Sequence, residues 1–162
     1  MSDEIYPVEL VAPDIEPYRK GNIGIDFVTC FDSGKPGPHV MINAVTHGNE
    51  ICGAIALDHL FKASVRPKHG KLTLGFINHL AYSNFDPENP GASRFVDEDF
   101  NRVWVEDRLE GLEVTAELRR ARELRPVFDT VDLLLDIHSM GTYSKPLMIC
   151  NGLKKEREFT VD

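Results

Sequence analysis

Two short pieces of this sequence, far apart along the chain, carry side chains of the types that bind metal ions. His47 and Glu50 follow the apolar run 40–46, and His138 closes a second apolar run, LLLDIH. Zinc prefers neutral imidazole nitrogen and carboxylate oxygen as ligands, and sites with two histidines and one glutamate keep a fourth position open for water. The residue types therefore indicate a zinc site formed by these three side chains.

Each piece also has a simpler interpretation. A His-x-x-Glu pair is common by chance, and Glu50 can merely favour the positive N-terminus of a helix. His138 can be a core histidine that is hydrogen-bonded to the backbone, because a polar group in an apolar run needs a partner. Since both pieces follow a predicted strand in the same way, the metal site is the interpretation that we favour.

A second group of polar side chains lies between these pieces. Arg94 is followed by the segment DFNR, residues 99–102. A guanidinium group binds a carboxylate through two parallel hydrogen bonds, and an asparagine can donate or accept beside it. The spacing alone favours the alternative, a solvated loop in which Asp97, Glu98 and Asp99 form surface ion pairs with Arg102, because such pairs are common.

The elements that would position these side chains alternate between strands and helices. A short apolar run suits a strand that is covered on both faces, and we expect residues 131–137 to be buried in this way. Pro126 is expected to break or kink the last turn of its helix. We expect strands at 23–29, 40–46, 71–78, 131–137 and 146–150, helices at 50–62 and 114–129, and a long loop at 81–94.

This alternation predicts an α/β fold with helices on both faces of a sheet. Functional residues collect beyond the C-terminal ends of the strands in such sheets, where His47 and His138 would both lie. A chain of 162 residues is near the size of one ordinary domain. The fold class that we expect is α/β, with three α/β/α layers around a mixed, largely parallel sheet.

Charge and hydropathy exclude several classes of partner. The chain has 18 Lys and Arg against 26 Asp and Glu, a net charge of −8, so a nucleic-acid partner or an anionic membrane surface is not expected. No apolar run approaches the roughly 20 residues needed to span a bilayer. The acidic N-terminus lacks the apolar segment of a signal peptide, and the three cysteines have no metal-binding spacing. We therefore expect a cytoplasmic protein.

Three motifs together resemble one known family. THGNE at 46–50, Arg94 with DFNR at 99–102, and LDIHS at 135–139 occur in the expected order. The combination resembles the succinylglutamate desuccinylase/aspartoacylase family, a branch of the zinc carboxypeptidase-like superfamily. The resemblance implies that His47, Glu50 and His138 bind one zinc ion per chain.

The resemblance also implies roles for the second group and a reaction. Arg94, Asn101 and Arg102 would hold the carboxylate and nearby oxygens of a substrate, and Asp99 would accept a hydrogen bond from a ligand histidine, which we take to be His47. The implied reaction is zinc-dependent hydrolysis of an N-acyl amino acid or a related small amide that carries a carboxylate. Zinc would polarise the scissile carbonyl and activate a water, and a glutamate would act as general base.

The chain differs from the family in the general base. The family's glutamate lies well downstream of the third ligand, whereas here only Glu156 and Glu158 follow His138, in the polar stretch KKERE. We interpret both as solvated surface residues, so the catalytic glutamate is not found in this chain. We expect residues 1–162 to be the N-terminal portion of a single zinc-hydrolase catalytic domain, without its later strands and its C-terminal domain, and inactive alone.

Two other functions stay open at this point. The chain can be a zinc-binding domain without catalysis that only captures a carboxylate ligand, or a carboxypeptidase-like enzyme that acts on peptides. A downstream glutamate would favour the amide hydrolase over the first, and an open cleft would favour the peptidase. Apolar surface left exposed by a missing remainder would favour self-association into a homo-oligomer. The sequence does not specify the acyl group.

Overall fold

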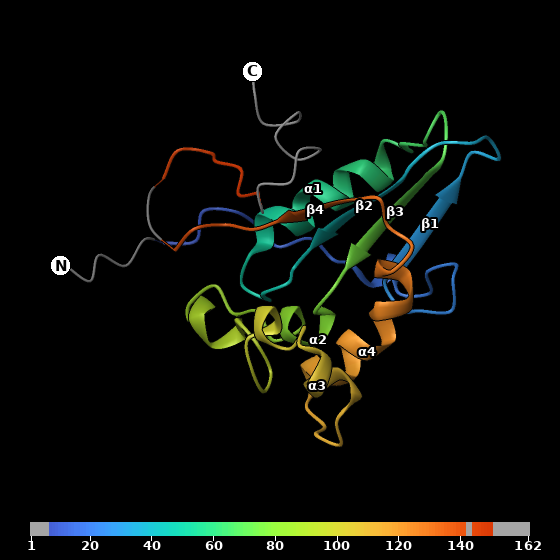
Figure 1. Ribbon diagram of the computed structural model, residues 1–162. Helices are drawn as coiled ribbons and strands as arrows, with labels where there is room; N and C mark the ends of the chain where they lie inside the picture. The colour runs from blue at the N-terminus through green and yellow to red at the C-terminus, as the bar shows by residue number, and fades with distance from the viewer. Residues whose placement is uncertain (1–6, 142–143, 151–162) are drawn as a thin grey trace.

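A mixed sheet of four strands forms the centre of the computed structural model, which describes residues 7–141 and 144–150 (Figure 1). The strand order is β1-β3-β2-β4. β2 lies parallel to both β3 and β4, and β1 is antiparallel to β3. The strands are β1 (Val28–Asp32), β2 (His39–Ala44), β3 (Lys71–Phe76) and β4 (Leu133–Ile137).

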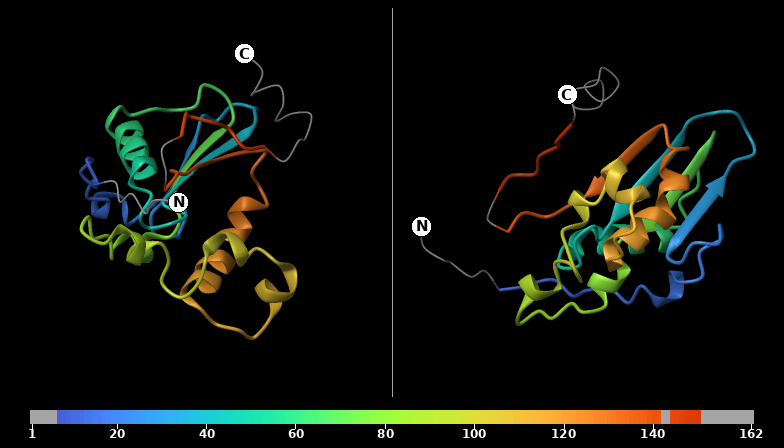
Figure 2. Two further views of the ribbon diagram at one scale, coloured as in Figure 1. Left: turned by 90° about the vertical axis from the view of Figure 1, so that its left-hand side faces the viewer. Right: turned by 60° about the horizontal axis from the view of Figure 1, so that its bottom comes forward.

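The helices form layers on both faces of this sheet, and Figure 2 shows α1 and α4 on opposite sides of it. Neighbouring residues of β2 contact different layers, as side chains on a strand alternate between its faces. Ile42 and Ala44 belong to the cluster that contains Leu57 of α1, whereas Met41 packs with Leu118 of α4. The three-layer fold with a largely parallel sheet is therefore confirmed. The helices are α1 (Ile51–Lys62), α2 (His79–Tyr82), α3 (Glu106–Glu110) and α4 (Ala116–Phe128).

The first predicted strand is displaced. Residues 23–27 form turns, and β1 begins at Val28. Two residues in this stretch have positive backbone φ angles, Gly24 at 80° and Phe27 at 61°, which a continuous strand does not permit. The Asn22 side chain binds the backbone N–H and C=O of Cys30 at 2.8 and 2.7 Å and so ties the turn against the strand.

The C-terminal strand predictions were partly wrong. β4 forms, but it pairs only with β2 among the described residues, and Leu134 and Leu135 are 52% and 44% exposed rather than buried. The stretch 146–150 is exposed and forms no strand in the described part of the chain. An apolar run predicts burial only when another element covers it, and this sequence pattern does not show whether one does.

Two smaller expectations also need correction. α4 continues through Pro126 to Phe128, so the predicted helix break is wrong. Proline removes one backbone donor near the end of the helix, and the N–H of Asp129 still reaches the Arg125 carbonyl at 3.0 Å. The expected loop 81–94 contains the end of α2 and a 3₁₀ turn, η2 (Pro90–Ser93). A second such turn, η3 (Phe100–Arg102), follows it, and a third, η1 (Glu16–Tyr18), lies near the start of the chain.

Candidate metal centre

The three predicted ligands meet at one edge of the sheet. Parallel neighbours β2 and β4 end side by side, with Ala44 paired to Ile137. His47 lies in the turn after β2, Glu50 is the residue before α1, and His138 directly follows β4. The C-terminal ends of parallel strands share one edge, so residues 88 positions apart come into contact there.

Glu50 lies between the two histidines. Its Oε1 lies 2.8 Å from Nδ1 of His47, and its Oε2 lies 2.7 Å from Nδ1 of His138. One ligand atom from each residue lies within 4.8 Å of the other two. His47 and Glu50 are buried, whereas the His138 side chain is 35% exposed. The donor atoms are therefore buried on the side of His47 and Glu50 and accessible from the side of His138.

The opposite nitrogen of each histidine is bound to an aspartate. Nε2 of His47 lies 3.2 Å from Oδ1 of Asp99, and Nε2 of His138 lies 2.9 Å from Oδ2 of Asp136. The hydroxyl of Thr46 donates to Asp136 at 2.9 Å. Carboxylates in this position fix the ring orientation and leave the other nitrogen free to bind a metal. Two oriented Nδ1 atoms and a carboxylate suit a zinc ion.

Electrostatics couple Glu50 to His138. Burial raises the pKa of Glu50, but hydrogen bonds from His138 and His47 outweigh this effect and lower the pKa to about 2. Hydrogen bonds with Asp136 and Glu50 raise the pKa of His138 to about 10. These shifts show that Glu50 is stabilised as a carboxylate by a neighbouring positive charge, which a bound cation would also supply.

Gly48 allows the turn between the ligands to pack closely against a neighbouring loop. A Cβ atom at this position would collide with the backbone of Ala81, Tyr82 and Ser93. The Gly48 N–H donates to the carbonyl of Arg94 at 3.1 Å. The absence of a side chain at residue 48 thus lets the segment with Arg94 and Asp99 lie directly against His47.

The structure brings part of the second predicted group to this centre. Nη1 of Arg94 lies 3.5 Å from Oε1 of Glu50, and its Nη2 lies 3.1 Å from Nε2 of His47. The His47 nitrogen can accept from Arg94 only when it carries no proton, and it donates to Asp99 when it does. Only the second tautomer leaves Nδ1 free for a metal ion.

Asn101 and Arg102 lie further out. Both are exposed, and their side chains make no recorded contact with the triad within the described residues. Arg102 reaches only the carbonyl of Asn101, at 3.5 Å. Within the described residues Arg102 forms no ion pair with Asp97, Glu98 or Asp99. Ion pairs do form in the loop with other partners, because Asp99 pairs with Arg94 at 3.4 Å and Glu98 with Arg108 at 2.6 Å.

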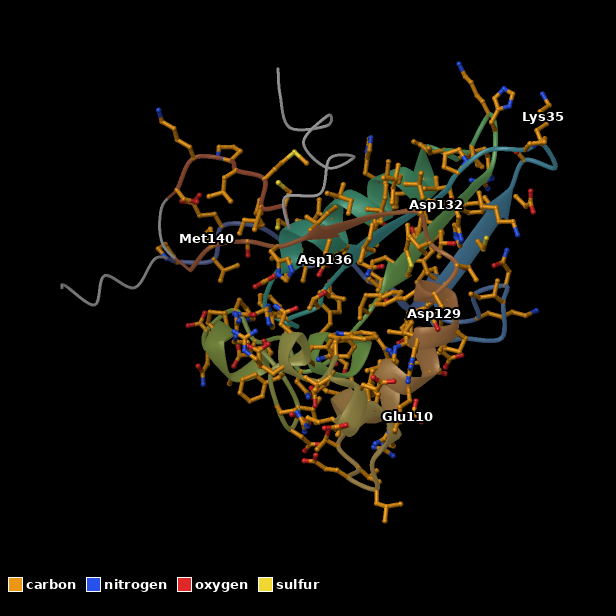
Figure 3. The ribbon with its side chains drawn as sticks, in the orientation of Figure 1. Lys35, Glu110, Asp129, Asp132, Asp136 and Met140 are labelled. Carbon is orange, nitrogen blue, oxygen red and sulfur yellow. The ribbon has the colours of Figure 1, made fainter. Side chains whose placement is uncertain are left out.

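Asp136 was not among the residues that we predicted for the site. Its signal was present, because residues two apart on a strand project from the same face and Asp136 stands two before His138. The interpretation of Glu156 and Glu158 as surface residues lies outside the described residues. Figure 3 shows Asp136 and Met140 near the β4 end of the sheet that carries the centre.

Among the described residues, every helix is too short or too polar to span a membrane.

Two solved structures that share less than 25% sequence identity with this chain have a similar fold. An aspartoacylase family protein from Mesorhizobium loti matches with a TM-score of 0.53 at 23% identity, over 75% of this chain and 38% of that one. A succinylglutamate desuccinylase from Chromobacterium violaceum matches with a TM-score of 0.55 at 18% identity, over 70% and 37%.

Sequence comparisons identify the family. An aspartoacylase from Xenopus tropicalis is 30% identical, over 78% of this chain and 41% of the relative, so the chain spans less than half of that protein's length. The family model described as "Succinylglutamate desuccinylase/Aspartoacylase catalytic domain" matches residues 36–161, which include all three motifs. The chain therefore belongs to the succinylglutamate desuccinylase/aspartoacylase family.

Proposed function

We propose that this chain supplies the metal-binding part of a zinc-dependent hydrolase that removes the acyl group from an N-acyl amino acid or a related small amide with a carboxylate. One zinc ion would bind Nδ1 of His47, the carboxylate of Glu50 and Nδ1 of His138. The observation that carries the proposal is the position of Glu50 between the two Nδ1 atoms, at 2.8 and 2.7 Å. Family membership supports the deacylase class.

A bound zinc ion supplies Lewis acidity at the scissile carbonyl and lowers the pKa of water there. The protein's own side chains orient the reaction. Asp99 and Asp136 hold the two imidazole rings through their Nε2 atoms. Arg94 contributes a positive charge next to Glu50, and its side chain is 41% exposed, so it can reach a substrate oxygen. Positive groups in this position stabilise the negative charge that develops on a carbonyl oxygen.

The substrate's carboxylate is the proposed partner of the outer arginine. Arg102 and Asn101 are exposed on η3, the turn that Asp99 caps, and Arg102 has no carboxylate partner within the described residues. A guanidinium group without an ion pair can bind a carboxylate by two parallel hydrogen bonds. This arrangement supports a small acidic substrate, as the name of the relative aspartoacylase also suggests.

The proposal assigns the proton shuttle to a carboxylate outside the described residues. Glu50 is the glutamate at the centre, and its two oxygens face the two histidines. Asp99 and Asp136 hold histidine rings and are not free to transfer protons. The second candidate is a zinc-binding domain that captures a carboxylate ligand without hydrolysis.

Hydrolysis assays on the full-length protein separate the candidates. The zinc-loaded protein is given N-acetyl and N-succinyl derivatives of aspartate and glutamate, and release of the free amino acid is measured. We expect hydrolysis that a chelator abolishes and added zinc restores. Zinc binding without hydrolysis of any of these amides would favour the ligand-capturing domain, and faster cleavage of dipeptides would favour a peptidase.

A further inference from the structure

Glu117 is a buried carboxylate with no role in the proposed chemistry. It lies in the first turn of α4, and its exposed fraction is 0%. The loop that carries Arg94 and Asp99 passes directly over it. We infer that Glu117 is a positioning residue, which holds three consecutive backbone amides of this loop and thereby fixes Asp99 against His47.

Four hydrogen bonds carry the inference. Oε1 of Glu117 accepts from the backbone N–H of Val96 at 2.7 Å and from the Asn78 side chain at 3.1 Å. Its Oε2 accepts from the backbone N–H groups of Asp97 and Glu98 at 3.0 and 3.4 Å. Both oxygens are therefore used as acceptors, and the three backbone donors all belong to residues 96–98.

The loop binds the helix in return. Oδ2 of Asp97 accepts from the backbone N–H of Ala116 at 2.7 Å, and Oε1 of Glu98 accepts from the Thr115 hydroxyl at 2.6 Å. Thr115 is the residue that caps α4, and its hydroxyl oxygen accepts from Leu118. A side chain of the loop thus accepts from a backbone N–H at the start of the helix, and a side chain of the helix accepts from backbone N–H groups of the loop. Buried backbone donors are costly to leave unpaired.

The position of Asp99 depends on this connection. Asp99 follows Glu98 directly, and its Oδ1 accepts from the Asn101 N–H at 2.9 Å as well as facing His47. On the other side of the held amides, the Arg94 carbonyl accepts from Gly48. The segment is therefore fixed both to α4 and to the turn between the ligands, and a shift of residues 96–98 would move Asp99 away from Nε2 of His47.

A purely structural role for Glu117 would have a different consequence. Loss of a cap lowers the stability of a protein wherever the cap lies. If Glu117 acts by positioning Asp99, substitution of either residue weakens zinc binding through the same contact with His47. The losses in zinc-binding free energy then do not add when both residues are changed. Additivity of the two effects therefore distinguishes a positioning role from a purely structural one. The inference rests on the proposed zinc site.

The test is a double-mutant cycle on the full-length protein with Glu117→Gln and Asp99→Asn. Each Glu117 oxygen accepts from two donors. A glutamine replaces one of these oxygens by an NH₂ group, so in either orientation of the amide two of the four donors lose their acceptor. Zinc affinity is measured by competition with a chromophoric chelator. We expect each single variant to bind zinc roughly 10- to 100-fold more weakly, the usual effect of losing a group that orients a ligand. The double variant should bind no more weakly than the weaker single variant.

Glu123→Gln is the matched control, because Glu123 lies on the same helix and pairs with Arg120 rather than with the loop. It should bind zinc as the wild type does. Wild-type affinity in Glu117→Gln, or losses that multiply in the double variant, would overturn the inference. If Glu117→Gln does not fold, Glu117→Asp, which withdraws the carboxylate by one methylene, takes its place in the cycle.

A second readout does not depend on zinc. The ¹⁵N resonances of the His47 ring report which nitrogen carries the proton, and they respond to replacement of the Asp99 carboxylate by a neutral amide. In the metal-free protein, Glu117→Gln should move them in the same direction as Asp99→Asn, and Glu123→Gln should not. Unmoved resonances would overturn the inference, whereas absence of zinc binding by the wild type would contradict only the proposed function.

Discussion

Asp136 and His138, two residues apart at the end of β4, are joined by a hydrogen bond of 2.9 Å between Oδ2 and Nε2. This bond turns Nδ1 of His138 toward Glu50, and the Thr46 hydroxyl holds the same carboxylate from the motif that contains His47. The two distant motifs are thus connected through Asp136 as well as through Glu50.

We expect Asp136→Ala to weaken zinc binding roughly 10- to 100-fold while the fold is retained, because the His138 ring loses the partner that orients it. Zinc affinity and circular dichroism measure the two effects. Asp129→Ala, at the exposed end of α4, is the matched control and should leave the affinity unchanged. An Asp136 variant with wild-type affinity would show that the aspartate does not orient the ligand.

The sequence predicted best the part of the fold that is locally encoded. The strand at 40–46, the turn at His47 and the helix to Lys62 all form within a few residues of the expected bounds. Their signals, an apolar run and then apolar positions at helical spacing, lie within one continuous segment. The same reasoning placed His47 and His138 at strand ends, and the structure brings them together.

Features that depend on tertiary contacts were missed. The turns at residues 23–27 require positive φ angles that an alternating apolar pattern does not reveal. The exposure of Leu134 and Leu135 depends on what lies beside β4, which the sequence of the strand does not encode. The contacts of Glu117 join residues about 20 apart through backbone donors, and no side-chain pattern marks those.

Arg102→Ala in the full-length protein should mainly impair hydrolysis of amides that carry a carboxylate. Loss of a charge-assisted hydrogen bond costs about 1.5–3 kcal/mol, so kcat/KM should fall roughly 10- to 150-fold. A neutral analogue should be hydrolysed almost as before. Arg119→Ala, an exposed arginine on α4, is the control. Equal losses on the charged and neutral substrates would contradict a role for Arg102 in carboxylate binding.

His79 should make the protein less stable at acid pH. Burial lowers its pKa to about 4, with added repulsion from Arg120 and Arg19. An unfolded histidine has a pKa of about 6.5, so between these values the unfolded chain binds the extra proton and stability falls as the pH falls. The loss by pH 4.5 is roughly 2 kcal/mol, after allowance for partial exposure of the ring.

His79→Phe should remove this loss, because phenylalanine can keep the stacking on Phe27 without titrating. Urea unfolding at pH 7.5 and pH 4.5 gives the free energy of unfolding of both proteins. The decrease between the two pH values should be smaller in the variant by roughly 2 kcal/mol. An equal decrease in both would mean that folding does not lower the pKa of His79.

The zinc content of each chain is the most direct test of the proposed metal site. Elemental analysis is made on the wild type, on His138→Ala and on His59→Ala, an exposed histidine of α1, all prepared together. We expect about one zinc per chain in the wild type and in His59→Ala, and far less in His138→Ala. Full zinc content in His138→Ala would show that the ion is held elsewhere and would contradict the triad of His47, Glu50 and His138.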